Sequence, residues 1–87
     1  MSVYLVERSL AGFSMDQLAA AQRGAIDTAA QMSREAAPVR YIRSTFLPES
    51  GKCMCLFEAA DADTISNLNH TAGLPFDRIV TALDLTP

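Results

Sequence analysis

Two cysteines separated by one residue, Cys53 and Cys55, are the residues of this chain best suited to chemistry. Alternate side chains of a β-strand point to the same face, so the two thiols share a face if this segment is a strand. Two thiolates on one face can chelate a soft or borderline metal ion. Free cysteines are also often small buried hydrophobic residues, and a strand Cys-x-Cys lacks the paired Cys-x-x-Cys geometry of zinc sites. Metal ligation and simple burial are therefore the two interpretations of this pair.

Glu7 and His70 are the further candidate metal ligands. A carboxylate is unusual in the middle of a strand, so Glu7 either pairs with an arginine such as Arg43 or serves as a ligand or base on an open sheet face. His70, the only histidine, falls away from the apolar stripe of its expected helix and should be exposed. It could act as a metal ligand or proton carrier. The predicted metal ligands are Cys53, Cys55, His70 and Glu7, and a dimer would double their number.

Apolar periodicity, together with capping and turn signals, predicts the elements that position these residues within a single domain, residues 1–87. Ser14 and Gln17 have the spacing of a capping box at the start of the first helix, and Pro38 stops that helix. Asp61 is a candidate N-cap for the second helix, which Gly73 ends. The expected strands cover residues 3–10, 39–47, 53–59 and 78–85, with a tight turn at 48–51.

The order β-α-β-β-α-β is the split β-α-β, or ferredoxin-like, arrangement of the α+β class. Right-handed crossovers place both helices on one face of a four-stranded antiparallel sheet, which leaves the other face open. The third strand is apolar on both sides, with Cys53 and Cys55 on one side and Met54 and Leu56 on the other. Because two helices supply only one covering layer, we expect a homodimer in which a second copy covers the open face. The thiols are expected near that subunit boundary.

Composition and charge limit the classes of partner. The chain has 87 residues and a net charge of −3, and its seven basic residues are scattered along it. Nucleic-acid binding is not expected, because phosphate contacts require clustered basic side chains. No apolar run approaches the ~20 residues of a membrane span, and Glu7 and Arg8 interrupt the first apolar stretch, which argues against a signal peptide. We therefore expect the protein in the cytoplasm, where thiols stay reduced.

Four segments together resemble a known family. They are Tyr4-Leu5-Val6-Glu7-Arg8, Arg43-Ser44, Cys55-Leu56-Phe57-Glu58-Ala59 and Ala72-Gly73-Leu74-Pro75-Phe76-Asp77-Arg78-Ile79. In this order and spacing the chain resembles the small bacterial nickel-binding ferredoxin-like family, formerly classed as a domain of unknown function. The cysteine segment and the glycine-leucine-proline segment are the most specific parts of the resemblance.

The resemblance implies a ferredoxin-like homodimer with nickel ions bound near the subunit boundary. Cys55 and His70 match positions where the family often carries cysteine and histidine. Many members have histidines in the second-strand segment, where this chain has Arg40 and Arg43. Arginine has no lone pair to donate to a metal. Metal binding through that segment is therefore in doubt for this chain.

Three functions compete at this point. The favoured one is a dimeric metal-binding protein for nickel or a similar divalent ion. The first alternative is a cofactor-independent enzyme of the dimeric α+β barrel type, with polar groups from Glu7, Tyr4 and Tyr41; it requires a closed cavity of several hundred Å³ between helices and sheet. Tyr4, Tyr41 and Phe46 could line such a pocket, although strand aromatics are more often core or interface residues. The second alternative is a dimerisation module without a ligand.

Overall fold

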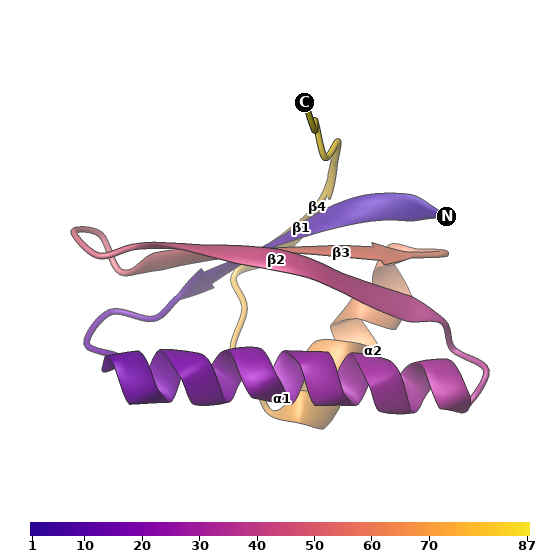
Figure 1. Cartoon of the computed structure of the whole chain (residues 1–87), viewed down its shortest axis with the longest axis horizontal. Helices are drawn as coiled ribbons and strands as arrows, with labels where there is room; N and C mark the ends of the chain where they lie inside the picture. The colour runs from indigo at the N-terminus through magenta and orange to yellow at the C-terminus, as the bar shows by residue number, and fades with distance from the viewer.

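A computed structural model describes residues 1–87 and confirms the predicted order of elements (Figure 1). The elements are β1 (Ser2–Ser9), α1 (Met15–Arg34), β2 (Val39–Leu47), β3 (Lys52–Ala59), α2 (Ala62–Ala72) and β4 (Arg78–Ala82). All strand pairs are antiparallel, in the order β2-β3-β1-β4. Both helices lie on one side of the sheet and the other side carries no helix, as Figure 1 shows. The chain therefore has the ferredoxin-like α+β fold.

The predicted helix boundaries follow from side-chain caps. Ser14 and Gln17 form the reciprocal capping box, with the Ser14 hydroxyl accepting from the Gln17 backbone N–H at 3.1 Å. The Asp61 carboxylate accepts from the Thr64 backbone N–H at 2.9 Å, and Gly73 ends α2 with a left-handed φ of 69°. Pro38 was the predicted stop of α1, and the helix ends four residues earlier, at Arg34, with Ala36 at a φ of 66°. The chain turns there before Pro38 instead of continuing the helix.

The last strand is shorter than predicted. β4 ends at Ala82, and the expected extension to residue 85 is not part of the sheet. Arg43 on β2 pairs with Asp84, and its Nη2 lies 3.3 Å from Asp84 Oδ2. β2 and β4 are opposite edges of the sheet. The Arg43–Asp84 ion pair therefore holds the C-terminal residues across the helix-free face.

A β-bulge in β2 reverses which residues face the helices. Tyr41 is paired with Phe57 and Arg43 with Leu56, so Ile42 is the extra residue. Before the bulge, Val39 and Tyr41 lie on the helix side; after it, the helix side is taken by Ser44, paired with Cys55, and Phe46, paired with Cys53. The bulge therefore sets which β2 side chains stand next to the thiols.

The hydrophobic core lies between the sheet and the helices. Its members include Val6, Phe57, Ile65 and Leu68, all with 0% exposure. Strand β3 alternates between buried and half-buried residues along its length. The half-buried set, which includes Met54 and Leu56, lies on the helix-free face.

Gly51 is the glycine whose backbone fixes the β2–β3 turn against the start of the first loop. It has a φ of 75°, and a Cβ at this position would lie 2.6 Å from the Ala11 Cα. The Leu10 N–H also donates to the Gly51 carbonyl at 2.7 Å. A side chain at Gly51 would push these two segments apart. Gly12 has a similar φ of 83°, but nothing lies within 4 Å of the position its Cβ would take.

Gly51→Ala is therefore expected to destabilise the fold more than Gly12→Ala. Both substitutions place alanine in the left-handed region, at a cost of about 1–2 kcal/mol, and only Gly51→Ala adds a clash, worth about 1–3 kcal/mol more. Urea unfolding of the two variants measures the difference. Equal losses of unfolding free energy would show that the contact with Ala11 does not constrain the turn.

Candidate functional site

The two thiols lie beneath helix α1, on the covered side of the sheet. Cys53 and Cys55 are 6% and 5% exposed, and their sulfur atoms are 3.9 Å apart. The two thiols share one face of β3 because side chains two residues apart in a strand point to the same side. The thiols point toward the helices and away from the open face that a second copy is expected to cover.

A fully buried arginine stands beside the thiols. Arg8 is 2% exposed and follows Val6 on the core-facing side of β1. Its Nε lies 3.5 Å from Cys55 Sγ, while its Nη1 donates to Asn69 Oδ1 and, at 3.0 Å, to the Pro75 carbonyl. Asn69 in turn donates through Nδ2 to the Ile65 carbonyl at 2.8 Å. These bonds tie β1 to α2 and to the loop that follows it.

No acidic side chain pairs with Arg8. The ion pairs of the molecule involve other cations, all of them on the surface. The remaining guanidinium nitrogen, Nη2, is buried and has no hydrogen-bond partner. An arginine side chain does not lose its proton in a protein. The core therefore contains a positive charge for which the chain supplies no carboxylate.

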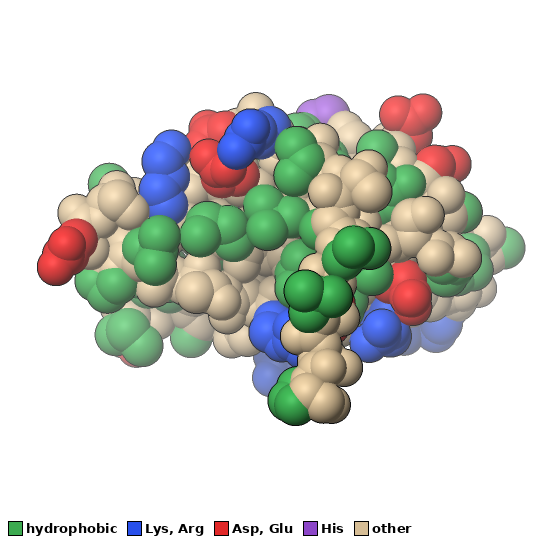
Figure 2. Space-filling view, turned by 90° about the horizontal axis from the view of Figure 1, so that it is seen from above, with side chains coloured by type: hydrophobic (Ala, Val, Ile, Leu, Met, Phe, Trp, Pro, Cys, Tyr) green, Lys and Arg blue, Asp and Glu red, His purple; other side chains and the backbone are tan.

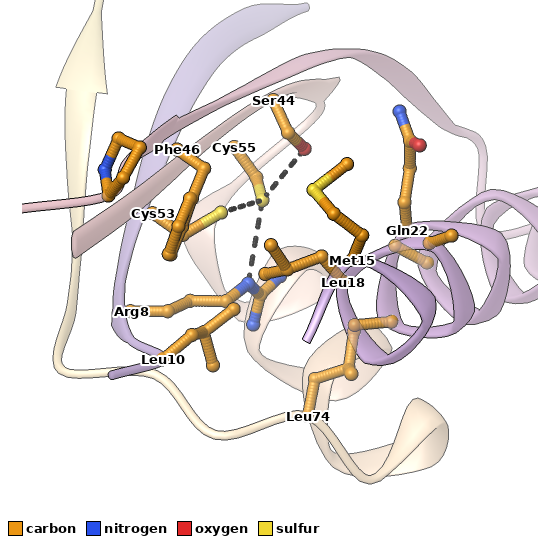
Figure 3. A pocket seen from close by; sticks show the side chains of 14 residues that line it. Arg8, Leu10, Met15, Leu18, Gln22, Ser44, Phe46, Cys53, Cys55 and Leu74 are labelled. Carbon is orange, nitrogen blue, oxygen red and sulfur yellow. Dashed lines mark hydrogen bonds between the residues drawn. The ribbon is translucent and has the colours of Figure 1, made fainter. Parts of the chain in front are cut away.

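A chain of hydrogen bonds leads from the surface of α1 to the second thiol. Gln22 Nε2 donates to the Tyr41 hydroxyl at 2.9 Å, and the Tyr41 and Ser44 hydroxyls are 2.7 Å apart. The Ser44 hydroxyl donates to Cys55 Sγ at 3.1 Å. Ser44 and Arg8 thus both direct donors at Cys55 Sγ, as the dashed lines in Figure 3 show.

These groups line a pocket of about 410 Å³ between α1 and the sheet (Figure 3). Arg8, Gln22, Ser44 and both thiols form its polar part. Most of the other lining residues are hydrophobic; they include Leu10, Met15, Leu18, Ala21, Ala25, Phe46 and Leu74. The alanine stripe of α1 explains the space, since methyl side chains do not reach the sheet there. The Ala-rich helix thus leaves the layer open at this end.

Burial controls the ionisation of the first thiol. Removal from water, followed by the neighbouring Cys55, raises the pKa of Cys53 from 9.0 to about 11, although Arg8 acts in the opposite direction. Cys53 is therefore a protonated thiol at neutral pH. Any step that needs its thiolate must first remove that proton.

Glu7 lies on the opposite face of the sheet from the thiols. Its carboxylate accepts from Arg78 Nε at 3.0 Å, and Lys52 Nζ lies 3.9 Å from it. The predicted alternative of an arginine partner on a neighbouring strand is confirmed, but the partner is Arg78 and not the suggested Arg43. Register explains this, because Glu7 is directly opposite Arg78 in the β1–β4 pair.

His70 is exposed near the end of α2, as its position on the helix predicted. Its ring lies beside Phe76, with the ring centroids 5.8 Å apart. The structure brings together only Cys53 and Cys55 of the four predicted ligands. No group of three or more His, Cys, Asp or Glu side chains in the subunit is arranged to hold a metal ion.

The pocket also bears on the enzyme alternative. The pocket volume is within the range that the enzyme alternative requires. Of the residues expected to line such a pocket, Phe46 does so, whereas Glu7, Tyr4 and Tyr41 do not. Sequence reasoning did not identify Arg8 and Ser44. The alternation of β1 contained a signal for Arg8, because Arg8 shares a strand face with Val6. Ser44 had no such signal, because its position depends on the bulge.

The sequence matches a model of the SCO4226-like family, described as nickel responsive protein SCO4226-like, over residues 4–81. The chain belongs to this family. The crystal structure of SCO4226 from Streptomyces coelicolor A3(2) is similar to it with a TM-score of 0.76 and 22% identity, covering 99% of this chain and 100% of that one. That likeness supports the fold. No curated protein matches the chain significantly.

The family match includes Arg8, Ser44 and both cysteines, all within residues 4–81. Neither helix of this family member has the length and apolar character needed to cross a membrane.

The raised pKa of Cys53 predicts a thiol titration step at high pH. Ultraviolet thiolate absorbance of the reduced protein should show a step near pH 11, and that step should be missing in Cys53→Ser. Because the folded-state pKa of Cys53 lies above 9.0, the stability contributed by the protonated thiol is complete below pH 9 and is lost as the pH rises toward 11. Absence of a Cys53-dependent step near pH 11 would contradict the described burial.

Proposed function

We propose that this protein binds nickel or a similar thiophilic divalent ion through Cys53 and Cys55. The observation that carries the proposal is the pair of sulfur atoms 3.9 Å apart on the wall of the pocket. Nickel is chosen because of the family description. Reduced thiols are required, which is consistent with the expected cytoplasmic location.

The sulfur spacing suits a single bound ion. Two sulfurs at about 2.3 Å from a tetrahedral ion are separated by ~3.8 Å, and a right-angle arrangement at the same bond length brings them to ~3.3 Å. The observed 3.9 Å is close to the first value. The thiol pair therefore fits a metal as a two-sulfur donor with little movement of β3.

The charges around the thiols make metal binding dependent on pH. Cys53 must lose a proton to become a ligand, and its pKa is about 11. The ion must therefore displace that proton, so affinity rises with pH. Arg8 stands 3.5 Å from Cys55 Sγ; its charge favours thiolates but opposes an approaching cation. Two thiolates balance the charge of a divalent ion, and the charge of Arg8 remains without a counter-charge.

Further ligands must come from outside the thiol pocket of one subunit. Glu7 lies on the other side of the sheet, where Arg78 pairs with it. His70 is exposed on α2 beside Phe76 and does not line the pocket. Arg40 and Arg43, at the positions where the resemblance implies histidines, pair with Glu58 and Asp84. A second copy on the helix-free face would not reach the thiols, so we propose that solvent completes the coordination.

Nickel binding should depend on both thiols. Titration of reduced wild-type protein with Ni(II) is expected to produce thiolate charge-transfer absorption, and Cys53→Ala or Cys55→Ala should each lower the affinity by more than about 100-fold, since loss of a supporting residue alone costs 10–100-fold. Raising the pH from 7 to 9 should strengthen binding in the wild type.

Met54→Ala is the matched control, because Met54 lies between the two cysteines on the opposite face of β3. It should retain the absorption band and the affinity. Absence of a charge-transfer band, or unchanged uptake in Cys55→Ala, would refute the thiol site. Parallel titrations of His70→Ala and Glu7→Gln determine whether those residues contribute.

We propose a homodimer formed through the helix-free face. Figure 2 looks onto this face and shows hydrophobic side chains gathered in the middle with charged side chains at the sides. Leu5 is paired with Leu56 on one side and Val80 on the other, giving an apolar row across three strands. Leu83 and Leu85 in the adjoining tail are 83% and 88% exposed. A second copy would cover these apolar groups.

Val80→Glu tests this interface against an equally exposed control. Val80 and Phe13 are each 37% exposed, but Phe13 lies outside the sheet, just before α1. Val80→Glu should shift the protein from dimer to monomer in sedimentation at micromolar concentration, whereas Phe13→Glu should remain dimeric. A well-folded wild-type monomer at that concentration would rule out the dimer.

A further inference from the structure

We propose that the pocket between α1 and the sheet binds a small organic monocarboxylate with an apolar body, and that Arg8 receives the carboxylate. The inference does not rest on the metal proposal, which concerns the thiols. Its basis is the combination of a buried guanidinium, an unpartnered nitrogen on it, and a pocket whose other walls are apolar.

The first step concerns charge. Burying an ion without a counter-charge costs several kcal/mol, and Arg8 is 2% exposed without an acidic partner. Asn69 and the Pro75 carbonyl supply hydrogen-bond acceptors but no negative charge. A ligand anion would supply the charge that the chain does not.

The second step concerns the geometry of the guanidinium. Nη1 is occupied by Asn69 and Pro75. The opposite edge consists of Nε, whose contact with Cys55 Sγ is long at 3.5 Å, and Nη2, which has no partner. Two parallel N–H donors on one edge of an arginine match the two oxygens of a carboxylate. This edge is therefore the part of Arg8 available to a ligand.

The third step concerns the body of the ligand. Ten of the 14 residues that line the pocket are hydrophobic when the two cysteines are counted, and Figure 3 shows the guanidinium end of Arg8 among Leu10, Leu18, Phe46 and Leu74. Such walls suit an aliphatic or aromatic group. One guanidinium matches one negative charge, so a doubly charged phosphate or sulfate would leave excess charge in an apolar site.

Access is through the side of the pocket formed by the first turns of α1. Met15, which lines the pocket, is 78% exposed. The volume of about 410 Å³ is within the range of small-molecule sites, ~300–1,000 Å³. A short-chain fatty acid such as octanoate has the required charge and shape, and it serves as the probe.

Calorimetric titration of metal-free protein in the presence of a chelator tests the inference. Octanoate should bind one per subunit, octanol should bind at least about tenfold more weakly because it lacks the charge-assisted contact, and inorganic phosphate should not bind. In Arg8→Met the preference for octanoate over octanol should disappear. A purely structural role of Arg8 would not change that preference.

Two alanines of α1 provide a variant pair that retains Arg8. Ala21 lines the pocket and Ala20 is exposed outside it. Ala21→Phe should reduce octanoate affinity at least about tenfold by filling the space, whereas Ala20→Phe should leave it unchanged. The inference is overturned if octanoate does not bind the wild type, if octanol binds equally well, or if Ala21→Phe retains the affinity. Because no metal is present, these outcomes do not affect the nickel proposal.

Discussion

The buried guanidinium of Arg8 is the constraint on which the rest of this structure depends. It cannot become neutral, so the fold must surround it with acceptors. Asn69 on α2 and the carbonyl of Pro75 fulfil that need on one side and fasten the end of α2 to β1. On the other side the guanidinium meets only the sulfur of Cys55, with one nitrogen unpaired. The buried charge and the unpaired nitrogen of Arg8 cost free energy that packing alone does not explain. We therefore place the proposed binding functions in the pocket beside Arg8.

The pocket itself results from three local features that act together. Short alanine side chains on α1 leave space above the sheet, and the bulge at Ile42 turns Ser44 and Phe46 into that space. The turn at Gly51, held against the first loop, closes the adjoining end of the β2–β3 pair. The same geometry places two sulfurs within chelating distance. The proposed metal site and the proposed carboxylate site therefore use different groups of one cavity, the sulfurs for the first and the guanidinium for the second.

Sequence patterns predicted the element order, the caps at Ser14, Asp61 and Gly73, and the two-sided apolar character of β3 because each depends on local spacing. They did not predict the bulge, since an extra residue in one strand is defined only by its partner strand. The face occupied by the thiols could not be assigned, because β3 is apolar on both sides and its composition does not distinguish them. The core-facing position of Arg8 could have been read from its place in β1, two residues after Val6. Predicted ligands on separate elements, such as Glu7 and His70, could not be placed relative to the thiols without the topology.

We propose that Arg8 serves ligand binding at a cost to the stability of the fold, and the double variant Arg8→Met, Asn69→Leu tests this most directly. Both partners of the Arg8–Asn69 contact are replaced by apolar side chains, a change that is often neutral or stabilising. The Pro75 carbonyl loses its donor but is only part-buried. Urea unfolding should therefore show a free energy of unfolding equal to or above that of the wild type, together with loss of octanoate binding. A loss of about 3–5 kcal/mol, the range for breaking a required buried pair, would show that Arg8 is primarily a structural residue and would contradict the account.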